Sequence, residues 1–590
     1  MALLKAVGLR LNASPVVTLG ADMGMILCLN LLHLLMNKMK AFFLRSRRWL
    51  AALLLGVMSL GSVAFVNNYF ELSKNIEIFT SLYREVNTYY VDEIDPAKFM
   101  RTGIDAMMKS LDPYTDYISE SEIEDFRFMT TGQYGGIGSL ISKKDDFVII
   151  ADPYEGFPAQ KADLRAGDVL LEVEGQSMEG KNTEDVSKLL KGQPRTEVKI
   201  KISRLGEPKP LEKVLLREEI KVESVSFSGM INEEVGYINL SGFRTNAANE
   251  VLKAFNDLKK QGMKKLVFDL RGNLGGSLDE AIRISGIFVP RGSVVVDTKG
   301  KVKEWDKTYR TTNEPADVNM PMVVLIDGSS ASASEIVSGV VQDYDRGVVI
   351  GQKSFGKGLV QTVRPLTYNT QVKITTAKYY IPSGRCIQAI DYSEKDANNR
   401  PVKKADSLRT AFKTRNGRVV YDAGGVSPDI ATEVRQLNNI TAVLVGKRHV
   451  FDFATIFRSK NKSISSPETF VVTEAIYNDF LEYIKDKDYE YTTESEKLLT
   501  DFKEKATKEQ YFDAISAEYD ALIVKKKRDK DQDIQKHKDE IKYFLEQEIV
   551  ARYYFQKGRL RASFDDDVEM KEALVVLNDE AKYNSILKPN

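Results

Sequence analysis

Apolar residues recur with two different periods along the chain, and the change of period divides the chain into segments. Between Val235 and Ile350, short apolar runs of strand length alternate with stretches in which apolar residues are three and four positions apart. This alternation predicts α/β layering in the middle of the chain. Strands are predicted over 237–240, 266–270, 322–326 and 348–350, and helices through 251–258, after Leu278 and through 336–341.

The flanking segments have other patterns. Helical spacing dominates 72–108 and is interrupted at Asp95-Pro96, which opens a second helix. The segment 134–207 combines short strands at 147–150, 169–173 and 198–202 with one short helix through 186–190. Beyond residue 435 the chain is rich in charge, with helical stretches at 468–485 and 494–556. Its run Lys525 to Arg528 is interpreted as a solvated helix face rather than a membrane or acidic-partner site.

We therefore predict a multidomain α/β protein. Its 590 residues exceed what one core can hold, yet 43% hydrophobic and 28% charged residues are an ordinary globular composition. The predicted order is an additional N-terminal extension (1–38), a signal peptide or membrane anchor (39–66), a helical N-terminal region (67–133), a β-rich domain (134–207), an α/β core (208–435) and a charged helical domain (436–590).

The segment before the first domain has the form of an export signal. A basic cluster over 40–48 precedes Trp49–Val66, which carries no charge and contains Ser62-Val63-Ala64, small residues that a signal peptidase reads. The run is also nearly long enough to be an uncleaved anchor, so cleavage and membrane attachment both stay open, with a buried core helix as the alternative. The basic flank stays in the cytoplasm, which predicts an extracytoplasmic, periplasmic location for the remainder. Residues 1–38 precede a second start, Met39, and are interpreted as a misassigned beginning.

Charge and residue counts exclude several kinds of site. Lys+Arg and Asp+Glu are both 84, which argues against a nucleic-acid protein. The two cysteines, Cys28 and Cys386, cannot build a disulfide framework or a thiolate metal cage. No histidine lies between 134 and 435, so a Ser-His-Asp triad in the core would need His449 to fold back. A zinc site is harder still to build, and we expect no metal and no cofactor.

A run of small residues follows one of the predicted strands. Residues 327–335 read Asp-Gly-Ser-Ser-Ala-Ser-Ala-Ser-Glu and lead from the strand at 322–326 into a helix. A serine on such a turn is exposed, and unpaired N–H groups in the first helical turn suit an oxyanion. Ser332 is therefore a candidate nucleophile. A capping box formed by Ser332 and Glu335 is the alternative.

A lysine between two glycines is the candidate base. Lys357 stands between Gly356 and Gly358, shortly after the strand at 348–350. An exposed lysine has a pKa of about 10.4 and stays protonated, so it needs desolvation before it can accept a proton near neutral pH. A phosphate-binding loop is the alternative, but its Gly-x-x-x-x-Gly-Lys-Ser/Thr order is missing.

The β-rich segment resembles a PDZ domain. The turn Leu164-Arg165-Ala166-Gly167-Asp168, which leads into Val169 and Gly175, is similar to the Leu-x-x-Gly-Asp run of that family. Gly136-Ile137-Gly138 matches the family's carboxylate-binding loop. The resemblance implies that backbone N–H groups at Gly136, Ile137 and Gly138 bind a peptide carboxylate while the peptide adds as a strand beside 139–142. A plain β-hairpin turn is the alternative.

The core resembles the carboxy-terminal processing, or tail-specific, serine peptidases. Ser-Ala-Ser-Ala-Ser-Glu at 330–335 and Phe-Gly-Lys-Gly-x-x-Gln at 355–361 carry the resemblance, with further matches at 111–114, 269–276, 380–384 and 424–429. It implies a crotonase/Clp-like α/β peptidase core in which Ser332 is the nucleophile and Lys357 the general base. Gln361, taken to lie one helical turn on, is implied to orient the lysine. Asp343 matches an acidic position in some members.

The same resemblance implies an oxyanion hole. An amide of Gly275 or Gly276, in the run Asp-Leu-Arg-Gly-Asn-x-Gly-Gly, is expected to form it together with the amide of Ala333. A bare glycine turn is the alternative. Departures from the family pattern are Leu274, where proline or glycine is common, and Cys386, where a small polar residue is usual.

The leading interpretation is a serine endopeptidase that recognises protein or peptide substrates by their free C-termini and cleaves them through an acyl-enzyme. The main alternative is a noncatalytic extracytoplasmic peptide-binding receptor or chaperone, against which the intact Ser332, Lys357 and Gln361 argue. A hydratase on the same core has no need of a PDZ module. An activating adaptor protein and a homo-oligomer stay open as partners, and membrane association depends on an uncleaved N-terminal segment.

Overall fold

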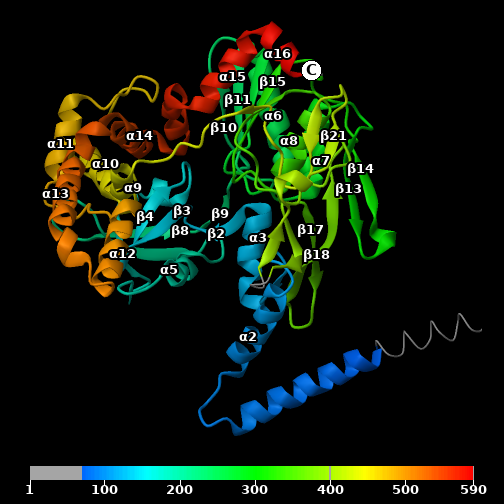
Figure 1. Ribbon diagram of the computed structural model, residues 1–590, viewed down its shortest axis with the longest axis horizontal. Coiled ribbons are helices and arrows are strands. Elements are labelled where there is room, and N and C mark those ends of the chain that lie inside the picture. Colours follow the sequence, from blue (N-terminus) through cyan, green and yellow to red (C-terminus); the bar gives the residue numbers. More distant parts are fainter. Residues whose placement is uncertain (1–68, 397–399, 589–590) are drawn as a thin grey trace, which may run out of the picture. The chain divides into compact units, whose positions relative to one another are not determined.

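The computed structural model describes residues 69–396 and 400–588 (Figure 1). The chain divides into two units, the first ending at Gly103 and the second beginning at Ile104. Residues 69–89 are helical, and α2 (Pro96–Lys109) begins directly after Asp95, whose carboxylate accepts amides of its first turn. The helix break predicted at Asp95-Pro96 is therefore confirmed. The export-type segment at 39–66 and the extension before it lie outside the described residues. Within the described ranges, no helix has the length and apolar character needed to cross a membrane.

A six-stranded sheet forms the centre of the second unit. Its order is β10-β11-β12-β15-β16-β23, with β10 antiparallel to β11 and all other neighbours parallel. β15 and β16 are buried along their whole length, as expected for parallel strands covered on both faces. The strands span Val225–Met230 (β10), Val235–Leu240 (β11), Lys265–Asp269 (β12), Met322–Ile326 (β15), Val348–Gly351 (β16) and Ile430–Ala431 (β23).

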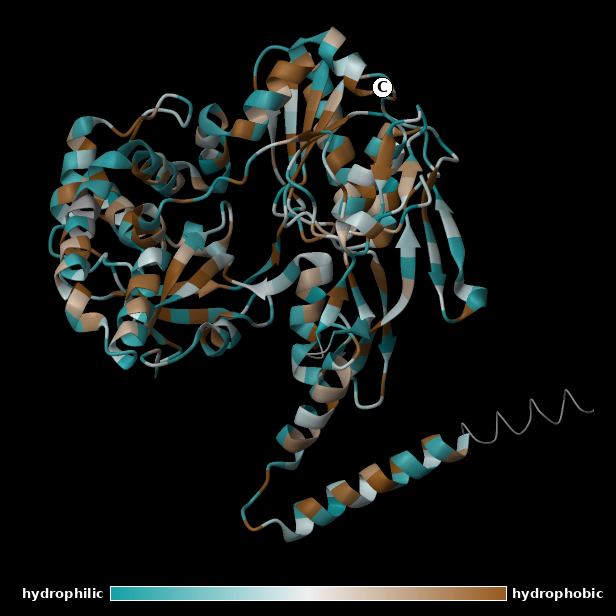
Figure 2. Ribbon diagram, in the orientation of Figure 1, coloured by the Kyte–Doolittle hydropathy of each residue, from teal (hydrophilic) through white to brown (hydrophobic). Residues whose placement is uncertain are grey.

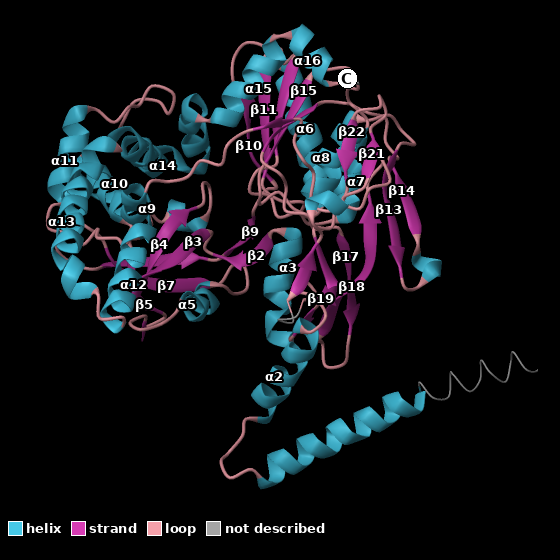
Figure 3. Cartoon of the chain, in the orientation of Figure 1, coloured by secondary structure: helices cyan, strands magenta, loops and turns pink. Residues whose placement is uncertain are grey.

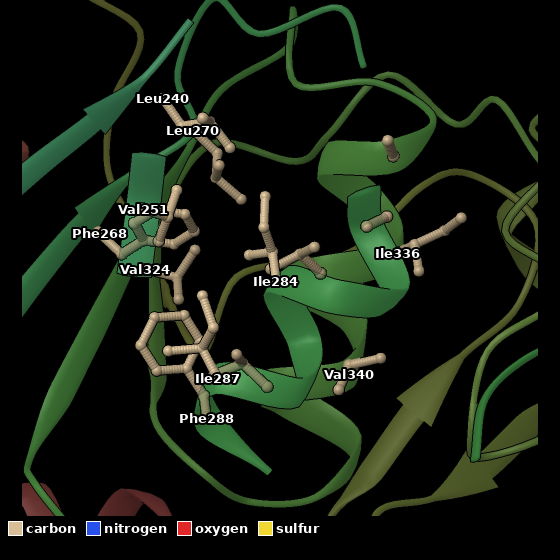
Figure 4. Packing of buried hydrophobic residues seen from close by; sticks show 14 of the residues in the cluster. Leu240, Val251, Phe268, Leu270, Ile284, Ile287, Phe288, Val324, Ile336 and Val340 are labelled. Carbon is tan, nitrogen blue, oxygen red and sulfur yellow. The ribbon is translucent and has the colours of Figure 1, made fainter. Parts of the chain in front are cut away.

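Three helices cover one face of this sheet: α6 (Ala247–Lys260), α7 (Leu278–Phe288) and α8 (Ala333–Asp343). Figure 4 shows Phe268 and Val324 of the sheet directed towards α7, where the rings of Phe268 and Phe288 are 5.7 Å apart. Every residue of α8 is buried. The helix that follows the serine-rich turn is therefore held rigidly inside the core.

The opposite face of the sheet is covered by the end of the chain. Helices α15 (Val568–Asn578) and α16 (Glu580–Ile586) pack there on apolar residues of the central strands. The hydroxyl of Tyr583 lies 3.1 Å from the backbone nitrogen of Met322 in β15. Arg271 pairs with Asp567 at 2.7 Å. Part of the segment predicted as a charged helical domain is thus a layer of the core.

An antiparallel sheet lies beside the core helices. Its order is β1-β18-β13-β14, and β17 also pairs with β18. β1 lies in the region predicted as helical, which also contains α3 (Ile123–Thr131). The strands span Asp116–Ile118 (β1), Val294–Gly300 (β13), Lys307–Arg310 (β14), Leu359–Pro365 (β17) and Gln371–Tyr380 (β18). Two small hairpins follow, formed by Ile390–Lys395 (β19) with Pro401–Lys403 (β20) and by Ala411–Lys413 (β21) with Val419–Tyr421 (β22).

The β-rich domain has its own core and its own sheet, of order β3-β4-β5-β7-β8 with β6 on β5. β3 is an edge strand, and it lies next to α5. Separately, β2 (Gln133–Gly136) pairs with β9 (Glu218–Lys221) where the chain enters and leaves this domain. The remaining elements are Ser139–Lys144 (β3), Phe147–Pro153 (β4), Pro158–Lys161 (α4), Val169–Val173 (β5), Gln176–Ser177 (β6), Thr183–Leu190 (α5), Glu197–Ser203 (β7) and Leu211–Leu216 (β8).

A helical domain with a separate hydrophobic cluster follows the core. Figure 3 shows it as helices without strands, and in Figure 2 hydrophilic and hydrophobic residues alternate along them, as on amphipathic surfaces. The predicted solvated run from Lys525 falls inside α13. The helices span Asn439–Gly446 (α9), His449–Lys460 (α10), Glu474–Ile484 (α11), Glu494–Lys508 (α12), Phe512–Lys536 (α13) and Lys538–Ser563 (α14). The predicted fold class, with its β-rich, α/β and helical parts, is confirmed.

Candidate functional site

Three turns meet at the carboxyl ends of the central parallel strands. The glycine turn 270–277 follows β12, the serine-rich turn 327–332 follows β15, and the lysine loop 352–358 follows β16. Because these strands are parallel neighbours, their carboxyl ends lie along one edge of the sheet, where open α/β sheets place their sites. The fold therefore brings the predicted Ser332, Lys357, Gly275 and Gly276 to one edge.

Ser332 occupies the junction between β15 and α8. Its backbone has φ 56° and ψ −112°, a conformation that is sparsely populated for any residue other than glycine. Holding such a residue costs about 1–3 kcal/mol, which the surroundings must supply. Ser332 is half-buried, and its amide donates to Glu335 at 2.8 Å. The turn is thus strained and anchored at the predicted nucleophile.

The carboxylate of Glu335 joins the serine turn to the lysine loop. Besides Ser332, it accepts hydrogen bonds from the hydroxyl of Ser354 at 2.5 Å and from the amides of Gly356 at 2.7 Å and Lys357 at 2.9 Å. Burial raises the pKa of Glu335 to about 7, although these hydrogen bonds lower it. All the partners are donors, so the geometry suits the ionised form, which only accepts. Glu335 fixes both predicted catalytic segments to one group.

Lys357 lies in a desolvated position. Burial, together with the nearby charge of Lys373, lowers its pKa to about 8, while Glu335 and Asp112 act in the opposite direction. Its Nζ lies 4.4 Å from the centre of the Tyr114 ring. Among the described residues, no carboxylate forms an ion pair with this amine, and it makes no hydrogen bond to Ser332. Lys357 therefore has the environment that a lysine base needs.

A second bridge between the two segments comes from β18. The hydroxyl of Tyr379, which is buried, lies 2.7 Å from the carbonyl oxygen of Lys357 and 3.1 Å from that of Ser332. Burial keeps the pKa of Tyr379 well above its usual range, so the hydroxyl stays a donor. No sequence motif singled out Tyr379, although the matched run 380–384 begins one residue later.

The glycine turn is held against the serine turn by serines of the same run. Ser330 Oγ donates to Leu270 O and Ser334 Oγ to Asn273 O, both at 2.8 Å. Two of the three serines around Ser332 thus have a structural task. A Cβ on Gly275 would lie 2.9 Å from the Cβ of Ser332, so this approach requires glycine.

The backbone N–H groups at this turn differ in whether they donate a hydrogen bond. The amide of Gly275 donates to Asn273 Oδ1 at 2.9 Å. Within the described residues, the amides of Gly276 and Ala333 make no such bond. Of the two glycines predicted for the oxyanion hole, Gly276 is therefore the one whose N–H remains available, together with that of Ala333.

Gln361 does not lie one helical turn after the lysine; that part of the prediction is wrong. It belongs to strand β17, because the chain after Gly358 pairs with β18 instead of forming a helix. Its Nε2 donates to Thr375 Oγ1 at 3.2 Å, and no hydrogen bond joins it to Lys357 among the described residues. The side-chain oxygen Oε1 accepts no hydrogen bond from the residues that the structure describes. Thr375 is in turn linked through Thr115 to Asp112.

Asp343, at the end of α8, has a structural position. It pairs with Arg385 at 3.0 Å, with both side chains 1% exposed. Burial raises the pKa of Asp343, opposed by the charge of Arg385. This buried pair ties α8 to the residue that follows the matched run 380–384 and is separate from Lys357.

The predicted peptide loop lies at the end of β2. Gly138 has φ 72°, and the side chain of Ile137 is buried in the β-domain core. Burial raises the pKa of Tyr134, while hydrogen bonds from the backbone of Ser139 and Gly138 to its phenol lower it. The backbone of Gly138 and Ser139 at the loop therefore lies close to the phenol of Tyr134.

Other candidate groups lie elsewhere. His449 contacts the carbonyl of Asp488 within the helical domain and does not fold back to Ser332. Across the described ranges, no cluster of His, Cys, Asp and Glu side chains could hold a metal ion. Tyr114 and Asp112, in the matched run 111–114, are the neighbours of the lysine that sequence reasoning did not assign a role. The sequence feature that could have pointed to them is the Asp-Pro-Tyr run itself.

Fold and site together define a multidomain α/β protein in which a PDZ domain accompanies a core with a strained serine and a desolvated lysine. Residues 149–204 match the family model "PDZ domain", 234–395 match "Peptidase family S41", and 440–577 match "Probable PDZ-protease, C-terminal helical domain". The "Carboxy-terminal-processing protease" of Bartonella bacilliformis is 34% identical over 328 residues, covering 55% of this chain and 75% of the relative.

Further relatives have similar names. The "Probable CtpA-like serine protease" of Staphylococcus aureus is 35% identical over 315 residues, 53% of this chain and 62% of the relative. The solved structure of the photosystem II D1 C-terminal processing protease is 28% identical and covers 60% of this chain and 92% of that chain, with a TM-score of 0.33. The chain belongs to peptidase family S41 and is a serine protease.

Replacing Glu335 tests whether its carboxylate holds the two segments together. In Glu335→Gln an NH2 group faces donors, so part of the set of hydrogen bonds is lost, and we expect kcat/KM to fall about 10- to 100-fold. The assay is hydrolysis of a fluorogenic peptide with an apolar free C-terminus, with thermal unfolding as a check of folding. Glu250→Gln is the matched control, since Glu250 also accepts backbone amides, at Ser224 and Val225. Unchanged kinetics in Glu335→Gln would contradict this role.

Proposed function

We propose that this chain is an exported serine endopeptidase that recognises protein C-termini through its PDZ domain and cleaves by a Ser332/Lys357 dyad. The observation that carries the dyad is the shared carboxylate of Glu335, which anchors the backbone of both residues. The lowered pKa of Lys357, about 8, supports its use as a base. The free carboxyl end of a protein or peptide is the proposed recognition element, supported by the backbone of Gly138 and Ser139 close to the phenol of Tyr134.

In the proposed mechanism, neutral Lys357 takes the proton of Ser332 as its Oγ attacks the scissile carbonyl carbon. The amides of Gly276 and Ala333 stabilise the oxyanion of the tetrahedral intermediate. When this collapses, Lys357 returns the proton to the leaving amine, and an acyl-enzyme remains on Ser332. A water molecule then attacks the ester and gives a proton to Lys357, which passes it to Ser332 as the new carboxylic acid leaves.

The amine of Lys357 has to move for this chemistry. It lies over the ring of Tyr114 and not on Ser332 in the free protein, and catalytic hydrogen bonds often tighten only with substrate bound. We assign Gln361 the orienting role because its Oε1 remains free to accept from the amine, while Nε2 is held by Thr375. Between turnovers the amine rests against the ring of Tyr114.

The proposed location is extracytoplasmic, on the pattern of residues 39–66. A basic cluster before an uncharged run is the form of an export signal, whether cut or kept as an anchor. Placing the PDZ domain and the core outside the cytoplasm gives them access to exported proteins as substrates.

The first prediction concerns the dyad. Ser332→Ala and Lys357→Ala should each lower kcat/KM at least about a thousandfold, and the double variant should be no worse than either, because the two residues act as one unit. Ser329→Ala, an exposed serine of the same turn, should keep normal activity. Losses that multiply in the double variant would count against a dyad. If Ser332→Ala still hydrolyses the substrate, the assignment of Ser332 as the nucleophile is refuted. If the unmodified chain hydrolyses no substrate, the receptor alternative is favoured.

The second prediction concerns pH. Because only the neutral amine accepts a proton, kcat/KM should rise about tenfold per pH unit below pH 8 and level off above it. Glu335, with a pKa of about 7, ionises in the same direction and adds to the rise. The measurement is kcat/KM between pH 6 and 9.5. Lys357→Arg is the control and should be inactive at all these pH values, since arginine stays protonated. A maximum below pH 7 would overturn the lysine base.

The third prediction concerns the substrate end. A carboxylate-binding loop cannot use an amidated tail, and losing a charge-assisted hydrogen bond of about 1.5–3 kcal/mol weakens binding about tenfold to 150-fold. A protein with an apolar free C-terminus should therefore be cleaved correspondingly faster than its amidated twin at subsaturating concentration. Equal rates would leave an unspecialised serine peptidase.

A further inference from the structure

A residue from the helical domain occupies one backbone carbonyl at the open edge of strand β3. β3 and β4 are joined by the two-residue turn Asp145-Asp146, with Lys144 opposite Phe147. In such hairpins the flanking pair is hydrogen-bonded, so the next residue, Lys143, points its backbone groups to the open edge. That outward carbonyl accepts a hydrogen bond from Arg448 Nη1 at 3.1 Å.

Arg448 is held in this place by several contacts. Its Nη2 donates to Ser142 Oγ at 2.8 Å, and its guanidinium lies 5.0 Å from the ring of Phe451. It precedes α10 with φ 66°, and the first turn of that helix is fixed to β3 by the pair Lys144–Asp452 at 2.7 Å. The position of Arg448 at the strand edge therefore depends on contacts from two domains.

A second cation connects the same end of β3 to the residues just before α5. The side chain of Lys143 reaches across to the carbonyl of Lys181, just before α5, at 2.8 Å. Among the described residues, neither Lys143 nor Arg448 forms an ion pair with a carboxylate. The nearby acids are Asp452, already bonded to Lys144, and the exposed turn residues Asp145 and Asp146.

Register decides which part of a bound tail meets these cations. If the last residue of the tail lies at Ser139 beside the carboxylate loop, the outward residues Ser139, Ile141 and Lys143 face the last, third-last and fifth-last residues. The carbonyl that would pair with the fifth-last residue is taken by Arg448. Strand pairing therefore covers four residues, and the fifth faces a guanidinium with N–H donors to spare.

We propose that Arg448 and Lys143 form a subsite that selects an acidic side chain at the fifth position from the end of a bound C-terminus. This rests on the proposed recognition of tails by the PDZ domain. The helical domain thereby takes part in substrate selection, because it supplies the guanidinium. A charged contact at the rim of a groove is worth about three- to tenfold in affinity and weakens with salt.

The test measures peptide binding by fluorescence anisotropy to the full chain carrying Ser332→Ala. The probes are fluorescein-labelled ten-residue peptides with an apolar last residue, bearing either Glu or Gln at the fifth position from the end, and the amidated form of each. We expect the Glu peptide to bind about three- to tenfold tighter than the Gln peptide, with the difference shrinking in high salt.

Variants assign the effect to the subsite. Arg448→Met should abolish the preference for Glu, and Lys143→Met should reduce it while leaving the strand backbone intact. Lys447→Met is the matched control. It removes one positive charge at the adjacent position, from a residue that pairs with Asp488. Thermal unfolding of each variant checks that the domains remain folded.

The outcomes separate this inference from the function on which it rests. If free and amidated peptides bind equally, tail recognition fails, and the subsite fails with it. A clear preference for free tails with equal affinity for the Glu and Gln peptides overturns the subsite alone. A Glu preference that survives in Arg448→Met also overturns the assignment.

Discussion

The carboxylate of Glu335 is the interaction on which the site depends. One buried group receives hydrogen bonds from the amide of Ser332 and from the amide of Lys357, residues that lie on different turns. The ionised acid loses hydration on burial, and four donors replace the water. The strain at Ser332 can persist because the turn is held from several sides, by Glu335, by Tyr379 and by the serines bound to the glycine turn.

The same burial has opposite consequences for two charged groups of one site. The ammonium of Lys357 is disfavoured, which lowers its pKa, and the carboxylate of Glu335 is disfavoured, which raises its pKa. The two values approach each other near neutral pH. Such convergence is typical of sites that transfer protons, whereas the pair Asp343–Arg385 is buried only to hold α8 in place.

The helical domain connects the other two parts. Helix α14 packs within the helical domain, contacts the PDZ domain through Gln556 and Asp152, and reaches the core through Arg561 and Met230. Its backbone is not helical at Phe555, where φ is 55° and ψ is −159°. A non-glycine residue in this region costs about 1–3 kcal/mol, so the bend is imposed by the contacts on either side. This helix thus links the PDZ domain to the peptidase core.

The sequence by itself determined several of the elements and which residues are candidates for the chemistry. The period of the apolar residues predicted β5 and β15 with their observed bounds. The runs at 330–335 and 355–361 marked Ser332 and Lys357 as candidates, because both runs are local patterns of neighbouring residues.

What only the tertiary structure decided depends on contacts between distant segments. Gln361 lies on a strand because β18 offers a partner, and Gly276 rather than Gly275 keeps a free amide because Asn273 folds back on its neighbour. Arg448 meets Lys143 across more than three hundred residues, and helices α15 and α16 cover the core although their composition suggests a separate domain. Long-range packing decides such pairings, and no local pattern records them.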